Sequence, residues 1–112
     1  MDYLQEVHED VIVQVVDLTR ATLKEADEFK YTLTRNIEQG YRKIVVDLSM
    51  CEFLDSTFLG ALVVTLKRVT AMGGDVRLVG FHPTVHAMME MTRMYRVFES
   101  FPTKEAAIRS FN

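Results

Sequence analysis

The residues best placed to do chemistry lie in one stretch of the chain, between an expected buried strand and an expected helix. This stretch, from Asp47 to Gly60, has the sequence Asp-Leu-Ser-Met-Cys-Glu-Phe-Leu-Asp-Ser-Thr-Phe-Leu-Gly. Asp55, Ser56 and Thr57 can each cap a helix by pairing with the free backbone N–H groups at its start. Open α/β sheets usually expose their functional groups at such a strand-to-helix junction. A cap and nothing more is the simpler interpretation, and spacing alone favours it.

A hydroxyl at a helix start can also carry a phosphate. The helix dipole and the free N–H groups stabilise negative charge there by about 0.3–1 kcal/mol at an exposed site. A phosphate on Ser56 would add about −1.5 to −2 charge to the surface, and the fold would tolerate it. Phe58 lies about 100° from Leu59 on a helical wheel, at the edge of the apolar stripe. We expect Phe58 either to anchor a partner beside the serine or to pack in the core.

Hydrophobic periodicity predicts the elements that position this stretch. The expected strands cover residues 3–8, 11–16, 43–48, 75–79 and 97–101, and the expected helices begin at Thr22, Asp55, His82 and Thr103. Glu9-Asp10 suits a tight turn, so the first two strands should form an antiparallel hairpin. Thr22 and Glu25 have capping-box spacing. The side chains predicted to face the core from the first helix are Leu23, Ala26, Phe29, Leu33 and Ile37.

The alternation of the remaining strands and helices predicts an α/β fold with a small, mostly parallel sheet. We expect the helices to pack mainly on one face of this sheet, because the chain has few strands and each helix has one apolar stripe. A doubly wound arrangement is the alternative, and periodicity does not separate the two.

Length and charge exclude several classes of protein. The chain has 112 residues, and its 13 Lys and Arg against 16 Asp and Glu give a net charge of −3. A chain of this length is expected to form one domain, over residues 1–112. It has no block of basic residues that would bind nucleic acid. It also has no apolar run of the roughly 20 residues that a membrane-spanning helix needs. The N-terminus has no secretory pattern, and the lone Cys51 cannot form an internal disulfide, so we expect a cytoplasmic protein.

Metal and hydrolase chemistry are weaker hypotheses. Two sets of side chains have the types that metal sites use, namely His82, His86 and Glu90 on one helix and Asp47, Glu52 and Asp55 around the junction. Pro83 disfavours helical geometry at the residue before it, so a cap and surface histidines are the better interpretation of the first set. Ser56 lacks the Gly-x-Ser-x-Gly elbow of hydrolases. We expect no metal, no cofactor and no catalytic residue.

The motifs resemble a known family over essentially the whole chain. Residues 44–49 (Ile-Val-Val-Asp-Leu-Ser), 54–57 (Leu-Asp-Ser-Thr) and 59–60 (Leu-Gly) resemble the STAS domain of bacterial anti-sigma factor antagonists. Gly73-Gly74 before a strand, and residues 83–85 (Pro-Thr-Val) opening a helix, match the same pattern. The resemblance implies a STAS fold.

The resemblance also implies a partner-switching protein without catalytic activity. A GHKL-type serine kinase that is also the anti-sigma factor would phosphorylate Ser56, and a metal-dependent serine phosphatase would remove the phosphate. The unphosphorylated form would bind the kinase and release a sigma factor.

The chain departs from the family pattern at two places. The family usually has glycine where this chain has Phe58, and the loop of residues 17–22 has an acidic residue, Asp17, but lacks the family's glycine. We expect the partner-binding surface to include Asp55, Thr57, Phe58, Asp17 and Thr19. The alternatives are a STAS subunit that regulates a transporter ATPase or joins a signalling scaffold, with Ser56 unmodified, and, from a different class, a small α/β enzyme.

Overall fold

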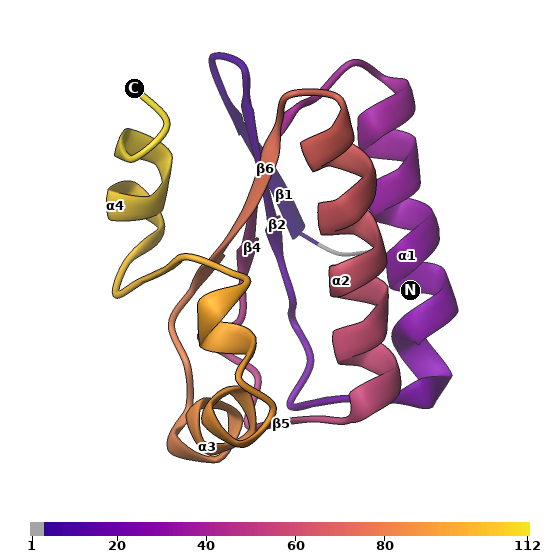
Figure 1. Ribbon diagram of the computed structural model, residues 1–112, viewed down its shortest axis with the longest axis vertical. Coiled ribbons are helices and arrows are strands. Elements are labelled where there is room, and N and C mark those ends of the chain that lie inside the picture. The colour runs from indigo at the N-terminus through magenta and orange to yellow at the C-terminus, as the bar shows by residue number, and fades with distance from the viewer. Residues whose placement is uncertain (1–3) are drawn as a thin grey trace.

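A five-stranded mixed sheet forms the centre of the protein, shown by a computed structural model that describes residues 4–112 (Figure 1). The strands are β1 (Leu4–His8), β2 (Val11–Val15), β4 (Lys43–Asp47), β6 (Asp75–Val79) and β7 (Ser100–Phe101), in the spatial order β1-β2-β4-β6-β7. β1 is antiparallel to β2, and the other pairs are parallel. Glu9 makes the hairpin turn with φ of +57°. The predicted hairpin and mostly parallel sheet are confirmed.

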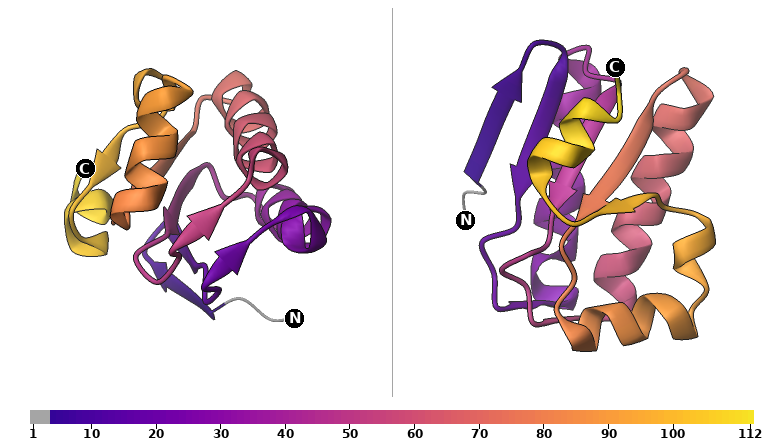
Figure 2. Two further views of the ribbon diagram at one scale, coloured as in Figure 1. Left: turned by 90° about the horizontal axis from the view of Figure 1, so that it is seen from below. Right: turned by 90° about the vertical axis from the view of Figure 1, so that its left-hand side faces the viewer.

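Two long helices pack side by side on one face of the sheet (Figure 1). These helices are α1 (Leu23–Glu38) and α2 (Ser56–Ala71). The shorter α3 (Pro83–Met91) and the 3₁₀ helix η1 (Met94–Arg96) lie at the end of the sheet where α1 and α2 begin, and α4 (Lys104–Arg109) covers part of the opposite face (Figure 2). The helices therefore pack mainly on one face, as predicted.

The alternation of side chains along β2 explains why both faces need covering. Ile12 belongs to the main core beneath α1 and α2, whereas Val11, Val13 and Val15 belong to a second cluster with Ala107 of α4. Apolar side chains point to both faces of the strand, since successive residues alternate between them. A strand of this type must be buried on both sides.

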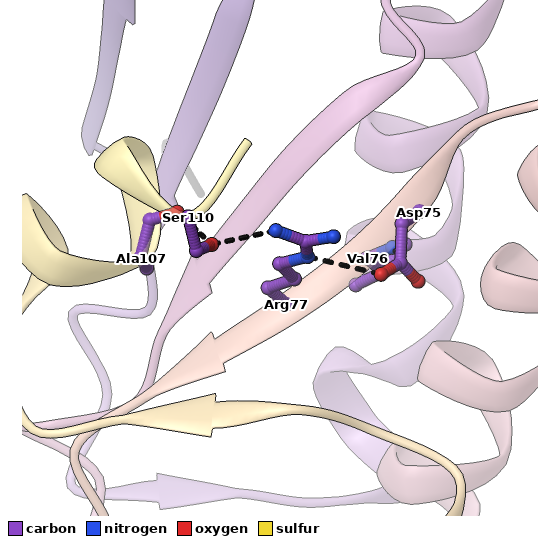
Figure 3. A network of polar contacts seen from close by, with 5 residues as sticks. All are labelled: Asp75, Val76, Arg77, Ala107 and Ser110. Carbon is purple, nitrogen blue, oxygen red and sulfur yellow. Dashed lines mark hydrogen bonds and ion pairs between the residues drawn. The ribbon is translucent and has the colours of Figure 1, made fainter. Parts of the chain in front are cut away.

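Polar contacts hold α4 against the sheet. The Arg77 guanidinium on β6 pairs with Asp75 at 3.0 Å and donates to Ser110 Oγ at 2.7 Å (Figure 3). It also lies 4.0 Å from the ring centroid of Phe111. Lys104 also forms an ion pair with Glu6 of β1. The hydrogen bond from Lys104 lowers the pKa of the Glu6 carboxyl. These contacts tie the C-terminal helix to β6 and to the edge strand β1.

Candidate functional site at the start of α2

A short parallel pairing positions the start of α2. The two-residue strands β3 (Arg20–Ala21) and β5 (Phe53–Leu54) pair with each other and form a separate small sheet (Figure 2). Thr19 O accepts hydrogen bonds from the backbone N–H groups of Glu52 and Phe53, at 2.8 and 3.2 Å. The loop after β2 is thus fixed beside the loop before α2. Sequence analysis did not predict this pairing.

Asp55 joins the starts of the two long helices. Its Oδ1 accepts from the backbone N–H of Phe58 at 2.9 Å, which caps α2. Its Oδ2 accepts from the backbone N–H of Leu23, the first residue of α1, at 2.8 Å. Both helices begin at the same end of the molecule (Figure 1). One carboxylate therefore satisfies N–H groups of two helices, and Asp55 has a structural role wider than the predicted cap.

Ser56 and Thr57 are exposed in the first turn of α2. Leu59 N–H bonds to Asp55 O, and Phe58 N–H bonds to the Asp55 carboxylate. Within residues 4–112, the backbone N–H groups of Ser56 and Thr57 have no hydrogen-bond acceptor, as expected for the first positions of a helix. The Ser56 hydroxyl is accordingly accessible to a modifying enzyme, with N–H groups beside it that can stabilise a negative charge.

Phe58 does not belong to the exposed surface, so its prediction as a partner-binding residue is wrong. Its side chain is 0% exposed and stacks on Phe29 of α1, with ring centroids 4.8 Å apart. The alternative prediction, core packing, is confirmed. The physical reason is that α1 lies directly against α2, so a side chain at the edge of the apolar stripe of α2 is covered by the neighbouring helix.

Two exposed apolar side chains near this end were not predicted as functional. Leu23, assigned above to the core, is 68% exposed, and its backbone is bonded to Asp55. Met50 is 54% exposed in the loop between β4 and β5. Leu23 is the first residue of α1. Its side chain projects beyond the apolar stripe that the later turns bury, so periodicity alone does not show that it is exposed. An apolar residue next to a capping box was the signal that could have identified Leu23.

Asp17 and Thr19 lie on the same end of the molecule as Ser56. Both are exposed, in the loop that leads from β2 to β3. The pairing of β3 with β5, and the hydrogen bond from Asp55 N–H to Ala21 O at 3.1 Å, bring this loop close to the start of α2. The structure therefore brings the two predicted parts of the surface together.

An apolar groove extends from this end along the contact between α1 and α2. Its volume is about 340 Å³, and its lining residues are Ala26, Asp27, Lys30, Thr57, Gly60, Ala61 and Val64. Thr57 connects the groove to the exposed first turn of α2. We refer to the exposed residues Asp17, Thr19, Leu23, Met50, Ser56 and Thr57 as the switch surface.

The other candidate residues have structural contacts. His82 Nδ1 accepts from Thr84 N–H at 3.4 Å, and the exposed His86 Nε2 lies 2.9 Å from Glu90 Oε1. No group of three or more potential metal ligands is present among residues 4–112. Asp47 accepts hydrogen bonds from the backbone and the hydroxyl of Ser49.

Cys51 is fully buried, and its thiol donates to Phe53 O at 3.1 Å. Burial raises the pKa of this thiol. A buried thiol of this kind is inert and serves packing.

Comparison with known proteins identifies the family. The model of the STAS domain matches residues 6–107. The chain belongs to the STAS domain family. A Thermotoga neapolitana protein, named as a candidate anti-sigma factor antagonist, is 29% identical over 104 residues, which is 92% of this chain and 91% of that protein.

Solved STAS structures have the same fold. A crystal structure of a candidate anti-sigma factor antagonist from Thermotoga maritima has a TM-score of 0.88 and 25% identity, covering 96% of this chain and 92% of that one. The anti-sigma factor antagonist SpoIIAA in its unphosphorylated form has a TM-score of 0.82 and 18% identity, covering 97% and 96%. The phosphorylated form of SpoIIAA from Bacillus has a TM-score of 0.74 and 17% identity, covering 97% and 99%. In this chain, no helix of residues 4–112 is long and apolar enough to cross a membrane.

Proposed function

We propose that this STAS protein is an anti-sigma factor antagonist that changes partner when Ser56 is phosphorylated. Its unphosphorylated form binds an anti-sigma factor that is also a GHKL-type serine kinase, and a sigma factor is thereby released. The kinase phosphorylates Ser56, which ends the binding, and a serine phosphatase restores the first state. The protein itself catalyses none of these steps.

The observation that carries this proposal is the placement of Ser56. Its side chain is exposed, whereas its neighbour Asp55 already uses both carboxylate oxygens to hold α1 and α2. A phosphate on Ser56 would meet the N–H groups of the first turn and would not need to displace the Asp55 cap. The modification can therefore change the surface while the fold is retained.

The composition of the switch surface explains how a phosphate would end binding. Leu23 and Met50 are exposed apolar side chains, and Asp17 adds a negative charge. A partner that covers these residues must exclude water from them. A group with about −1.5 to −2 charge would then have to be desolvated beside Asp17 and Asp55, which costs far more than desolvating a neutral hydroxyl.

The relatives support the proposal. The Thermotoga relative bears the name of a candidate antagonist, and SpoIIAA has been solved in both phosphorylation states with folds similar to this chain. A phosphate at an exposed helix start is compatible with such retention of the fold.

The test uses three variants of the full chain, purified with an affinity tag from the native host: Ser56→Ala, Ser56→Glu and the control Thr70→Ala, which removes an exposed hydroxyl near the other end of α2. Mass spectrometry should find phosphate on Ser56 of the wild type and of the control. The Ser56→Ala variant should retain a GHKL-type kinase, and Ser56→Glu should lose it. Equal retention by these two variants, with Ser56 unmodified in the wild type, would contradict the phosphoswitch. Retention of a transporter ATPase would favour the alternative.

A further inference from the structure

A small polar pocket lies between β1 and the C-terminal half of α1. Its volume is about 130 Å³, and its lining residues are Gln5, Tyr31, Thr32, Arg35, Asn36 and Gln39. Arg35 is twelve residues beyond Leu23, which corresponds to about 18 Å along the helix. The pocket is thus separate from the switch surface, and a ligand bound in it would be independent of the proposed function.

Asn36, the buried residue that lines this pocket, belongs to a cluster of hydrogen-bonded side-chain amides. Gln14 of β2 is 0% exposed, and Asn36 of α1 is 3% exposed. The Gln14 amide nitrogen donates to Gln5 Oε1 at 2.9 Å and to Asn36 Oδ1 at 2.8 Å. Amides in a protein interior destabilise the fold unless they are hydrogen-bonded. The hydrogen bonds of Gln14 therefore hold the side chains of Gln5 and Asn36 in place where β1 meets α1.

The hydrogen bonds of Gln14 determine which groups the pocket presents. An amide nitrogen has two hydrogens, and Gln14 uses both on its two neighbours. Gln5 and Asn36 therefore turn their carbonyl oxygens toward Gln14 and direct their NH₂ groups elsewhere. In the observed orientation the unpaired buried atom of Gln14 is Oε1.

The rim of the pocket adds a positive charge and further donors. Arg35 contributes a guanidinium group, Tyr31 a phenol and Gln39 an amide. No Asp or Glu is among the described residues that line the pocket. The site is therefore rich in donors and has a net positive charge, which suits a ligand with several acceptor oxygens.

We propose that this pocket binds a small oxyanion. The volume of about 130 Å³ corresponds to roughly four water molecules at about 30 Å³ each, so the ligand is of the size of inorganic phosphate or a short carboxylate. The Arg35 guanidinium pairs with two oxygens of the ligand, and the NH₂ groups of the exposed Gln5 and the buried Asn36 donate to the same ligand. The anion links the edge strand β1 to α1.

The test is a titration followed by ¹H–¹⁵N NMR of the side-chain NH₂ groups of the full chain. Sodium phosphate and sodium acetate are added separately, with sodium chloride at equal ionic strength as the reference. Saturable shifts of the Asn36 and Gln5 NH₂ signals with phosphate, with acetate or with both support the proposal, and the salt that saturates identifies the source of the oxyanion.

Matched variants test the assignment of the site. Arg35→Gln should weaken binding about tenfold or more, because it removes the charge-assisted bonds. Arg109→Gln removes an exposed arginine of α4, on the opposite face of the sheet, and should leave the affinity unchanged. Shifts that stay linear with concentration, that chloride reproduces, or that are equal in the two variants would overturn the proposal. Because the Ser56→Ala variant retains the pocket, it should titrate as the wild type does.

Discussion

Ser56 and Phe58 are two residues apart on α2 and occupy opposite environments. A helix turns about 100° per residue, so their side chains point about 200° apart. Ser56 is exposed at the surface, and Phe58 stacks on Phe29 inside the core. Substitutions at these two positions should therefore separate binding from stability.

Phe58→Ala should destabilise the protein by about 3–5 kcal/mol, because it leaves a cavity beside Phe29 in a fully buried site. Urea denaturation followed by circular dichroism measures this change. Phe58→Leu fills most of the cavity and should cost less. An unchanged unfolding midpoint for Phe58→Ala would mean that the ring does not contribute to the core.

Leu23→Ala should have the opposite effect, because it should weaken binding and leave the stability almost unchanged. The side chain is mostly exposed, so stability should change by no more than about 0.5 kcal/mol. Binding to the kinase that Ser56→Ala retains should weaken by about 1 kcal/mol or more, roughly fivefold, as for an apolar anchor. Isothermal titration calorimetry measures this. The control is Leu4→Ala, which removes another exposed leucine, from β1. Equal affinities of both variants would exclude Leu23 from the interface.

Residue types and spacing correctly predicted that α2 begins at Ser56 with Asp55 as its cap. They did not predict that Phe58 is buried and that Leu23 is exposed. Both lie where a helical wheel is ambiguous, at the edge of a stripe and in a first turn. The outcome depends on the partner across the helix contact. Phe29 covers Phe58, whereas Leu23 projects from the end of α1 with its backbone bonded to Asp55. The contact between Phe29 and Phe58 has no signature in the local sequence.

At the scale of elements, Asp55 couples α1 and α2 through one side chain. Asp55→Asn retains an oxygen for only one of the two N–H groups that the carboxylate accepts, and its NH₂ group faces the other donor. The expected loss is about 0.5–1.5 kcal/mol for the asparagine variant and about 2 kcal/mol for Asp55→Ala. Thermal denaturation checks the order wild type, Asn, Ala.

The control for this series is Asp17→Ala, which removes an exposed acid from the same surface. It should leave the melting temperature close to that of the wild type. If Asp55→Ala were no less stable than Asp17→Ala, the hydrogen bonds of Asp55 to both helices would not contribute to the free energy of unfolding.

Elements with strong periodicity or a clear cap were predicted well, including the short helix α4 after Thr103, whereas the two-residue strands were not. The hairpin, the central strands and the start of α2 follow from runs of β-branched residues and from caps. The pairing of β3 with β5 involves two residues on each side and rests on backbone bonds that any sequence can form. The last strand covers only Ser100–Phe101, and not the predicted residues 97–101. The residues before it form the 3₁₀ helix η1 and a turn in which Phe98 is buried in the core.

For the molecule as a whole, the two faces of the sheet have different roles. α1 and α2 bury the main core and present the switch surface at one end, while α4 closes the second cluster on the opposite face. Arg77 joins α4 to β6 through Ser110, Phe111 and Asp75, on the face of the sheet opposite α2. Docking of α4 and binding at the switch surface should consequently be independent.

Arg77→Met tests this independence. The methionine retains an apolar stem over the sheet but loses the hydrogen bond to Ser110 and the cation–π contact with Phe111, so stability should fall by about 1–3 kcal/mol. Hydrogen exchange should show faster exchange in residues 104–109, with protection of α1 and α2 reduced less. The affinity for the kinase should stay within about twofold of the wild type, because distant sites with no shared partners act additively. Arg109→Met, which removes an arginine from α4 that is exposed, should leave the exchange of α4 unchanged. Unchanged protection of α4 in Arg77→Met would show that apolar packing on the second cluster holds the helix by itself, and a loss of kinase binding would show that the two faces of the sheet are coupled.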